Sequence, residues 1–136
     1  MKPRLHDRLE GQVALVSGAT RGLGAQVAAD LYDLGAIVYA GARNPRDLAG
    51  ARSDSDDRVR PVRLDVTDED QVAGAVAAAV REAGRLDILV NNAGIYDGRR
   101  SDLLDFDTER FDLVLDTNVR GPALLAKHAL PHLLAR

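Results

Sequence analysis

The chain has 136 residues, of which 46% are hydrophobic and 29% charged, and this balance is typical of one soluble globular domain with its own core. A net charge of −3 and an aromatic content of 4% argue against nucleic-acid binding, while the lack of cysteine excludes disulfides, thiolate metal ligands and a cysteine nucleophile. The charged N-terminal segment and the lack of a long apolar run argue against a signal peptide or a membrane span, so we expect a cytoplasmic protein with neither membrane attachment nor a metal site.

Apolar runs and helical patterns alternate from the start of the chain. A strand is predicted over residues 13–16, a helix over 25–34 and a second strand over 37–40. Gly35 suits a left-handed cap at the end of that helix.

A polar loop is predicted over residues 44–55, with a short helical turn around 47–51. The third strand, over 59–64, contains Pro61, which cannot donate to a neighbouring strand and therefore favours a place at the edge of a sheet.

The next helix is marked by charge and by spacing. Thr67 stands where an N-cap is expected, and three acidic residues follow it in the first turn, where negative charge opposes the helix dipole. Gly84 is expected to end this helix. The apolar residues of this helix form one stripe at helical spacing, made of Val72, Ala75, Val76, Ala79, Val80 and Ala83.

A fourth strand over residues 86–90 is nearly all apolar, as expected for a strand covered on both faces. A loop over 91–102 follows it, and two helices are predicted over 107–116 and 118–136, the second kinked or shortened by Pro131. The whole succession predicts an α/β fold in which a parallel sheet carries helices on both faces. Right-handed crossovers favour the strand order 3-2-1-4.

The clearest functional signal is the stretch over residues 13–24, Val-Ala-Leu-Val-Ser-Gly-Ala-Thr-Arg-Gly-Leu-Gly. Gly18 permits a sharp turn, Gly22 lets N–H groups approach a phosphate, and Gly24 lets the helix pack closely. The start of the following helix offers unpaired N–H groups and a positive dipole to a pyrophosphate. The spacing differs from the commonest dinucleotide fingerprint, so an ordinary strand-to-helix turn is the alternative.

The end of the second strand predicts which dinucleotide is bound. A carboxylate there would bond the adenosine 2′-hydroxyl of NAD, but the strand ends in Ala40-Gly-Ala-Arg43. Arg43 can pair with a 2′-phosphate, and Arg21 in the glycine turn can add a second positive charge. We therefore expect NADP(H) in preference to NAD(H); the alternative is that both arginines are solvated surface charges.

Polar residues follow the later strands. Asp65, after the third strand, can accept a hydrogen bond from the adenine amino group or cap the next helix. In the segment Asn91-Asn-Ala-Gly94, asparagine amides can bridge backbone groups, and Ala93 and Gly94 leave room for a ribose. Asn118, taken alone, is most simply a helix cap.

Together, four motifs in this order closely resemble those of the short-chain dehydrogenase/reductase family. They are Ser17-Gly-Ala-Thr-Arg-Gly-Leu-Gly24, Asp65-Val66, Asn91-Asn-Ala-Gly94 and Asn118-Val-Arg-Gly121. The resemblance runs from about Leu9 to the C-terminus. It implies a Rossmann-type three-layer αβα domain and an NAD(P)-dependent oxidoreductase that moves hydride between nicotinamide and a carbonyl or alcohol substrate.

The resemblance also implies residue roles. The glycine turn would hold the pyrophosphate and Asp65-Val66 the adenine, while Asn91 would stabilise the central sheet. Asn118 would match the asparagine of the family's catalytic tetrad, and Ala93 and Gly94 would line the nicotinamide side. The expected cofactor-binding residues are Gly18, Thr20, Arg21, Gly22, Leu23, Gly24, Arg43, Asp65, Val66, Asn91, Ala93 and Gly94.

Other catalytic groups of the family are missing from this chain. The family uses a tyrosine followed four residues later by a lysine, and a serine that polarises the carbonyl. Four residues beyond Tyr32, Tyr39 and Tyr96 stand Ala36, Arg43 and Arg100. His128 and His132 have no evident partners and are expected on the surface or in packing.

We therefore expect residues 1–136 to form a single, incomplete cofactor domain that stops before a fifth strand and is inactive alone, the small-molecule substrate belonging to the full-length parent. Two alternatives are a non-catalytic NADP(H)-binding module and a folding fragment without a ligand. The unpaired edge of the fourth strand and the last helix are expected to drive self-association into a homo-oligomer.

Overall fold

A computed structural model of the chain describes residues 8–48, 57–96, 98 and 102–135. Its centre is a four-stranded parallel sheet in the order β3-β2-β1-β4, so the predicted fold class and strand order are confirmed. The strands are β1 (Val13–Val16), β2 (Ile37–Ala42), β3 (Val59–Arg63) and β4 (Ile88–Val90).

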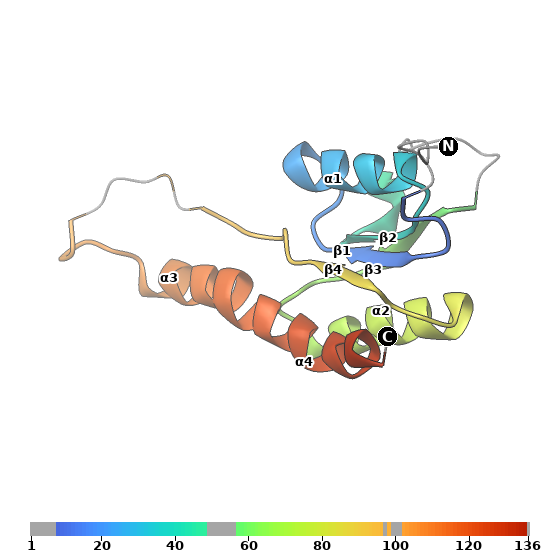
Figure 1. Ribbon diagram of the computed structural model, residues 1–136. Helices are drawn as coiled ribbons and strands as arrows, with labels where there is room; N and C mark the ends of the chain where they lie inside the picture. The colour runs from blue at the N-terminus through green and yellow to red at the C-terminus, as the bar shows by residue number, and fades with distance from the viewer. Residues whose placement is uncertain (1–7, 49–56, 97, 99–101, 136) are drawn as a thin grey trace.

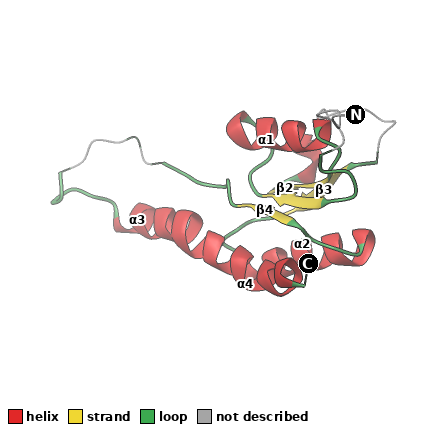
Figure 2. Cartoon of the chain, in the orientation of Figure 1, coloured by secondary structure: helices red, strands yellow, loops and turns green. Residues whose placement is uncertain are grey.

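Helices cover both faces of this sheet (Figures 1 and 2). Helix α1 (Gly22–Asp33) lies on one face, and α2 (Glu69–Ala83) and α4 (Gly121–Leu134) lie on the other. Helix α3 (Thr108–Leu115) extends away from the sheet and buries none of its side chains. None of the helices in the described ranges is long and apolar enough to cross a membrane.

The core lies in two layers because neighbouring residues of a strand point to opposite faces. Leu15 and Tyr39 face α2 and α4, whereas Val16 and Val38 face α1. All four residues of β1 are fully buried, as expected for a central parallel strand. The sheet therefore holds its C-terminal strand ends, where loops gather, on a rigid base.

The third and fourth strands form the two edges of the described sheet. Pro61 lies in β3, as the sequence predicted for an edge position. Strand β4 starts at Ile88 rather than at residue 86, and its three residues are only half-buried. Leu89 packs against the α2–α4 side of the core and Val90 against the α1 side, as expected for a strand covered on both faces, while no strand in the described part of the chain pairs with its outer edge.

The start of α2 differs from the prediction. Its N-cap is Asp68, whose Oδ1 accepts hydrogen bonds from the N–H groups of Asp70 and Gln71. The hydroxyl of Thr67 instead donates to Asp65 Oδ1 at 2.7 Å. The predicted Thr67 cap is therefore wrong by one residue, while Gly84 ends the helix in the left-handed conformation, as predicted.

The two helices predicted near the end of the chain form one continuous rod (Figure 1). Helix α3 passes through a π-helical turn, η3 (Asp116–Arg120), directly into α4. Pro131 lies inside α4, which continues to Leu134, so the expectation that it would cut this helix short is wrong.

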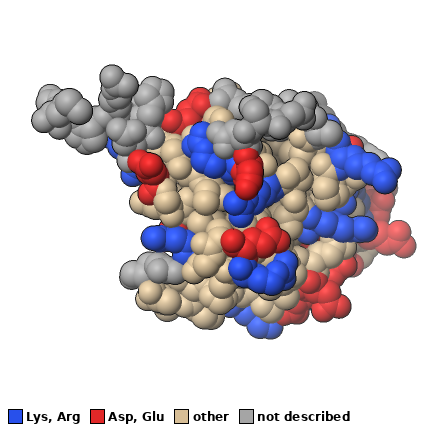
Figure 3. Space-filling model, turned by 90° about the vertical axis from the view of Figure 1, so that its right-hand side faces the viewer, with Lys and Arg blue, Asp and Glu red and all other residues tan. Residues whose placement is uncertain are grey.

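The polar loop after β2 contains a 3-10 turn, η2 (Pro45–Leu48), whose Leu48 is buried against the α1 side of the sheet. Residues 49–51 of the predicted helical turn lie outside the described residues. On the face drawn in Figure 3, acidic and basic side chains are interspersed rather than gathered by sign.

A charged contact ties α2 to α4. Glu69 Oε1 lies 2.7 Å from Lys127 Nζ and 3.0 Å from His128 Nε2. Hydrogen bonds from Lys127 and then His128 lower the pKa of Glu69 from 4.5 to about 2. His128 thus has a partner that the sequence did not reveal, and the same carboxylate binds Lys127.

We predict that this contact makes stability depend on pH in acid. Because the folded-state pKa of Glu69 is depressed, its contribution is complete above about 4.5 and is lost as the pH falls towards about 2. Glu69→Gln should flatten the slope of the free energy of unfolding against pH in this window, measured by urea unfolding. Asp70→Asn, on the same turn but outside the contact, should keep the wild-type slope; equal slopes for all three proteins would contradict the prediction.

Candidate functional site

The C-terminal ends of the strands open into a cavity of about 610 Å³, within the range of small-molecule and cofactor sites. All of the predicted cofactor residues except Asn91 line it. The sequence did not predict the other lining residues, which are Ala42, Asp47, Leu64, Thr67, Asn92, Ile95, Arg110, Leu113 and Thr117.

The glycine turn forms one wall of this cavity. Gly18 has a φ of +65°, and a Cβ there would come within 2.9 Å of the Cα of Ala93. A Cβ on Gly24 would clash with the carbonyl oxygen of Gly18 and with the side-chain amide of Asn92. The close approach expected at Gly24 is therefore to the turn itself and to the β4 loop, and neither glycine tolerates a side chain.

The N-terminus of α1 has neither a side-chain cap nor a negative charge to balance its dipole. Its N-cap residue, Arg21, makes no side-chain cap hydrogen bond, and no acidic residue stands in the first turn. Helices α2 and α3, by contrast, are capped by the carboxylates of Asp68 and Asp107. The first N–H groups of α1 and its positive dipole end therefore face the cavity side of the turn, where an anion is favoured.

The junction between β1 and β4 is closed by Asn92. Its Nδ2 donates to the carbonyl oxygens of Ser17 at 3.1 Å and Gly18 at 3.0 Å. The hydroxyl of Ser17 in turn accepts the N–H groups of Asn92 and Ala93, both at 3.0 Å. Asn91 is exposed and outside the cavity lining, so the amide bridging expected in this segment is made by Asn92.

The loop after β3 forms the opposite wall. Asp65 Oδ1 accepts from both the N–H and the hydroxyl of Thr67, and the Asp65 N–H donates to Gln71 at 3.0 Å. Since Asp68 caps α2, the helix-cap alternative for Asp65 is wrong. Val66 is 5% exposed, and a Cβ on Gly121 would come within 2.7 Å of its Cγ2. The close approach of α4 thus fixes this loop.

Asn118 lies within the π-helical turn and not at a helix start. Its Oδ1 accepts the N–H of Ile95 at 2.8 Å, and its Nδ2 donates to the Ile95 carbonyl at 2.7 Å. The helix-cap interpretation is therefore wrong: the side chain clamps the backbone of the loop after β4. Such π turns occur frequently at functional sites. Asn118 does not line the cavity, and its catalytic role stays a prediction.

The tyrosines lie in three different settings. Tyr39 is 1% exposed; its hydroxyl donates to Glu82 at 3.2 Å and accepts from Arg60 at 2.8 Å, and burial raises its pKa. Tyr32 packs under the guanidinium of Arg58, and Tyr96 is 86% exposed. The first two are structural. In the described ranges no group of three or more acidic or histidine side chains is placed to hold a metal ion.

A parallel sheet of this order, a glycine turn feeding an uncapped helix and a cavity at the strand ends together define a nucleotide-binding α/β domain of the Rossmann type. The sequence pattern of the short chain dehydrogenase family matches residues 12–136. The chain belongs to this family, as its motifs indicated.

Individual relatives agree with this assignment. The chain is 42% identical, over 91% of its length, to a cis-4-hydroxycyclohexanecarboxylate dehydrogenase of Sinomonas cyclohexanicum and 37% identical, over 94%, to a gluconate 5-dehydrogenase of Gluconobacter oxydans. It spans about half the length of these curated relatives, 50% of each. A crystal structure of a metagenomic short-chain oxidoreductase in complex with NADP is similar with a TM-score of 0.85 and 32% identity, over 94% of this chain and 59% of that one.

We predict that Asn92 and Asn91 differ sharply in their effect on stability. Asn92→Ala leaves two carbonyl oxygens at the β1 end without their donor, which should cost about 1–3 kcal/mol of unfolding free energy. Asn91→Ala, the matched control at an exposed position, should stay within about 0.5 kcal/mol of wild type. Chemical denaturation of the two variants checks this, and equal losses would show that the amide bridge is not what closes the junction.

Proposed function

We propose that this chain forms the NADP(H)-binding part of a short-chain dehydrogenase/reductase. The carrying observation is the cavity that joins the uncapped N-terminus of α1 to Arg21 and Arg43. Bound there, the cofactor would supply or accept hydride at a carbonyl or alcohol carbon of a small-molecule substrate. The residues of this chain would hold the cofactor and set its orientation.

The preference for the 2′-phosphorylated cofactor is supported by charge. Arg43 directly follows β2, where the adenosine ribose is expected, and Arg21 lies in the glycine turn. Both side chains are exposed, and neither forms a hydrogen bond or an ion pair with another residue in the described ranges. A phosphate dianion could engage both guanidiniums without displacing an existing partner. The NADP in the similar metagenomic oxidoreductase agrees with this preference.

The proton-transfer groups are proposed to lie outside these 136 residues. The chain contains no tyrosine with a lysine four residues later, and Lys127 is bonded to Glu69. Asn118 is the residue of this chain that we propose for the catalytic tetrad. Its two hydrogen bonds to Ile95 would keep the turn between α3 and α4 in place beside the nicotinamide side of the cavity.

We predict that the chain binds NADPH and that Arg43→Ala weakens this binding about five- to tenfold, while NADH binding changes little, because the substitution removes a charge opposite the 2′-phosphate. Nicotinamide fluorescence titration measures both dissociation constants. Arg46→Ala is the matched control, since this exposed arginine lies outside the cavity. Equal weakening of both cofactors by Arg43→Ala would contradict the assignment of the 2′-phosphate.

The rival functions separate in the same experiments. No binding at millimolar NADPH would leave only the ligand-free folding fragment. Binding without turnover is expected of the isolated chain, because without the catalytic groups binding alone cannot supply the rate. A longer parent protein that binds NADPH but also lacks turnover would favour the non-catalytic binding module.

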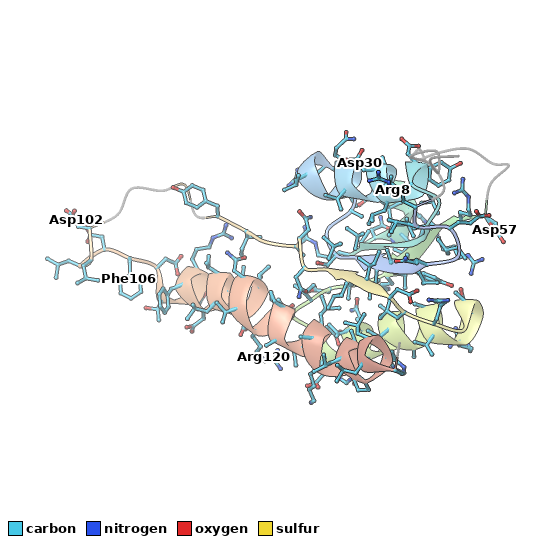
Figure 4. All side chains as sticks on the ribbon, in the orientation of Figure 1. Arg8, Asp30, Asp57, Asp102, Phe106 and Arg120 are labelled. Carbon is cyan, nitrogen blue, oxygen red and sulfur yellow. The ribbon has the colours of Figure 1, made fainter. Side chains whose placement is uncertain are left out.

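We further propose that the chain self-associates through the outer side of the α3–α4 rod and the edge of β4. Figure 4 places Phe106 and Asp102 at the far end of this rod, away from the sheet. Large apolar side chains on the rod remain 43–75% exposed, which is unusual for a monomer surface. They are Phe111, Leu115, Val119, Leu130 and Leu134.

We predict that Val119→Lys lowers the sedimentation coefficient of the chain at high concentration, because it places a charge in the apolar seam. Gln26→Lys, which adds the same charge on α1 at the opposite face, should leave sedimentation unchanged. A wild-type chain that stays monomeric at high concentration would refute the proposed self-association.

A further inference from the structure

The cavity contains a carboxylate that the sequence did not predict. Asp47 lines it together with Arg21 and Arg43, and it follows Arg43 by four residues. The end of β2 itself carries no acidic residue. The 3-10 turn η2, however, places the acidic side chain of Asp47 in the lining of the same cavity.

The position of Asp47 is set by the fold. Its N–H donates to the carbonyl of Asn44 at 3.0 Å, and the side-chain amide of Asn44 donates to its Oδ1 at 3.3 Å. Asn44 Oδ1 also accepts the N–H of Arg46 at 3.2 Å. Leu48, the next residue, is 4% exposed and packs into the core beneath α1. The carboxylate therefore belongs to an anchored turn.

Arginine and aspartate act in opposite directions on the two forms of adenosine ribose. A guanidinium favours a 2′-phosphate, whereas a carboxylate repels it and accepts a hydrogen bond from a free 2′-hydroxyl. Taken together, Arg21, Arg43 and Asp47 leave a net preference for the phosphate, but a smaller one than the two arginines alone would give.

We propose that Asp47 is a specificity-determining residue that restrains the preference of this site for NADPH and keeps NADH as a ligand. This inference rests on the proposed cofactor function. In this proposal Asp47 sets the ratio of the affinities for NADPH and NADH, while Arg43 provides the binding of the 2′-phosphate itself.

The test compares the dissociation constants of NADPH and NADH for the wild-type chain and for Asp47→Asn, by nicotinamide fluorescence. The substitution keeps the shape and an acceptor oxygen for Asn44 but removes the charge. It should tighten NADPH and weaken NADH, so that the ratio of the two constants shifts about fivefold or more towards NADPH. Asp30→Asn, an exposed acid on α1 outside the cavity, should leave the ratio unchanged.

The outcomes separate this inference from the function on which it rests. If both cofactors bind the wild type and Asp47→Asn leaves their ratio unchanged or moves it towards NADH, the role of Asp47 is overturned while the cofactor site stands. If neither cofactor binds the wild type, the proposed function fails and this inference fails with it. Thermal melting of each variant distinguishes a change of affinity from a loss of fold.

Discussion

The closure of the β1–β4 junction by Asn92 and Ser17 is the interaction on which the site depends. One side-chain amide binds two consecutive carbonyl oxygens at the end of β1, and one hydroxyl collects two consecutive N–H groups at the end of β4. These four bonds fix where the glycine turn begins and where the loop after β4 leaves the sheet. The φ of +65° at Gly18 and the contact of Gly24 with Asn92 follow from this closure, because both loops pass within van der Waals distance of it.

The rod formed by α3, η3 and α4 fixes the other side of the cavity. Asn118 clamps Ile95, and Arg120 Nη1 donates to the carbonyl of Thr67 at 3.3 Å, so one helical turn holds the loop after β4 and the loop after β3. The contact of Glu69 with Lys127 and His128 anchors the α4 part of the same rod to α2. Since two loops of the cavity depend on one helical element, a displacement of α4 would alter both of these walls of the cavity together.

The sequence predicted the fold well because alternating strands and helices with right-handed crossovers leave few topologies. It located the glycine turn and the loops that line the cavity, but not the side chains that hold them. Whether Asn91 or Asn92 faces β1 depends on the residue at which β4 ends, and the apolar pattern determines strand ends poorly. Thr67 and Asp68 are both good caps, and only the loop geometry selects Asp68. Asp47 reaches the cavity through a 3-10 turn, which local sequence does not orient.

The N-termini of α1, α2 and α3 differ in how far local interactions stabilise them. Asp68 and Asp107 cap α2 and α3, and each such cap is worth about 1 kcal/mol. Helix α1 lacks a cap and any first-turn acid, and a glycine at its start adds a further conformational cost. Departures from local preference gather at functional sites, where a ligand can offset the loss. A bound pyrophosphate would provide at α1 the negative charge that the other two helices carry in their own sequence. Asp47, which η2 places at the cavity, would act at the ribose end of such a ligand and not on its pyrophosphate.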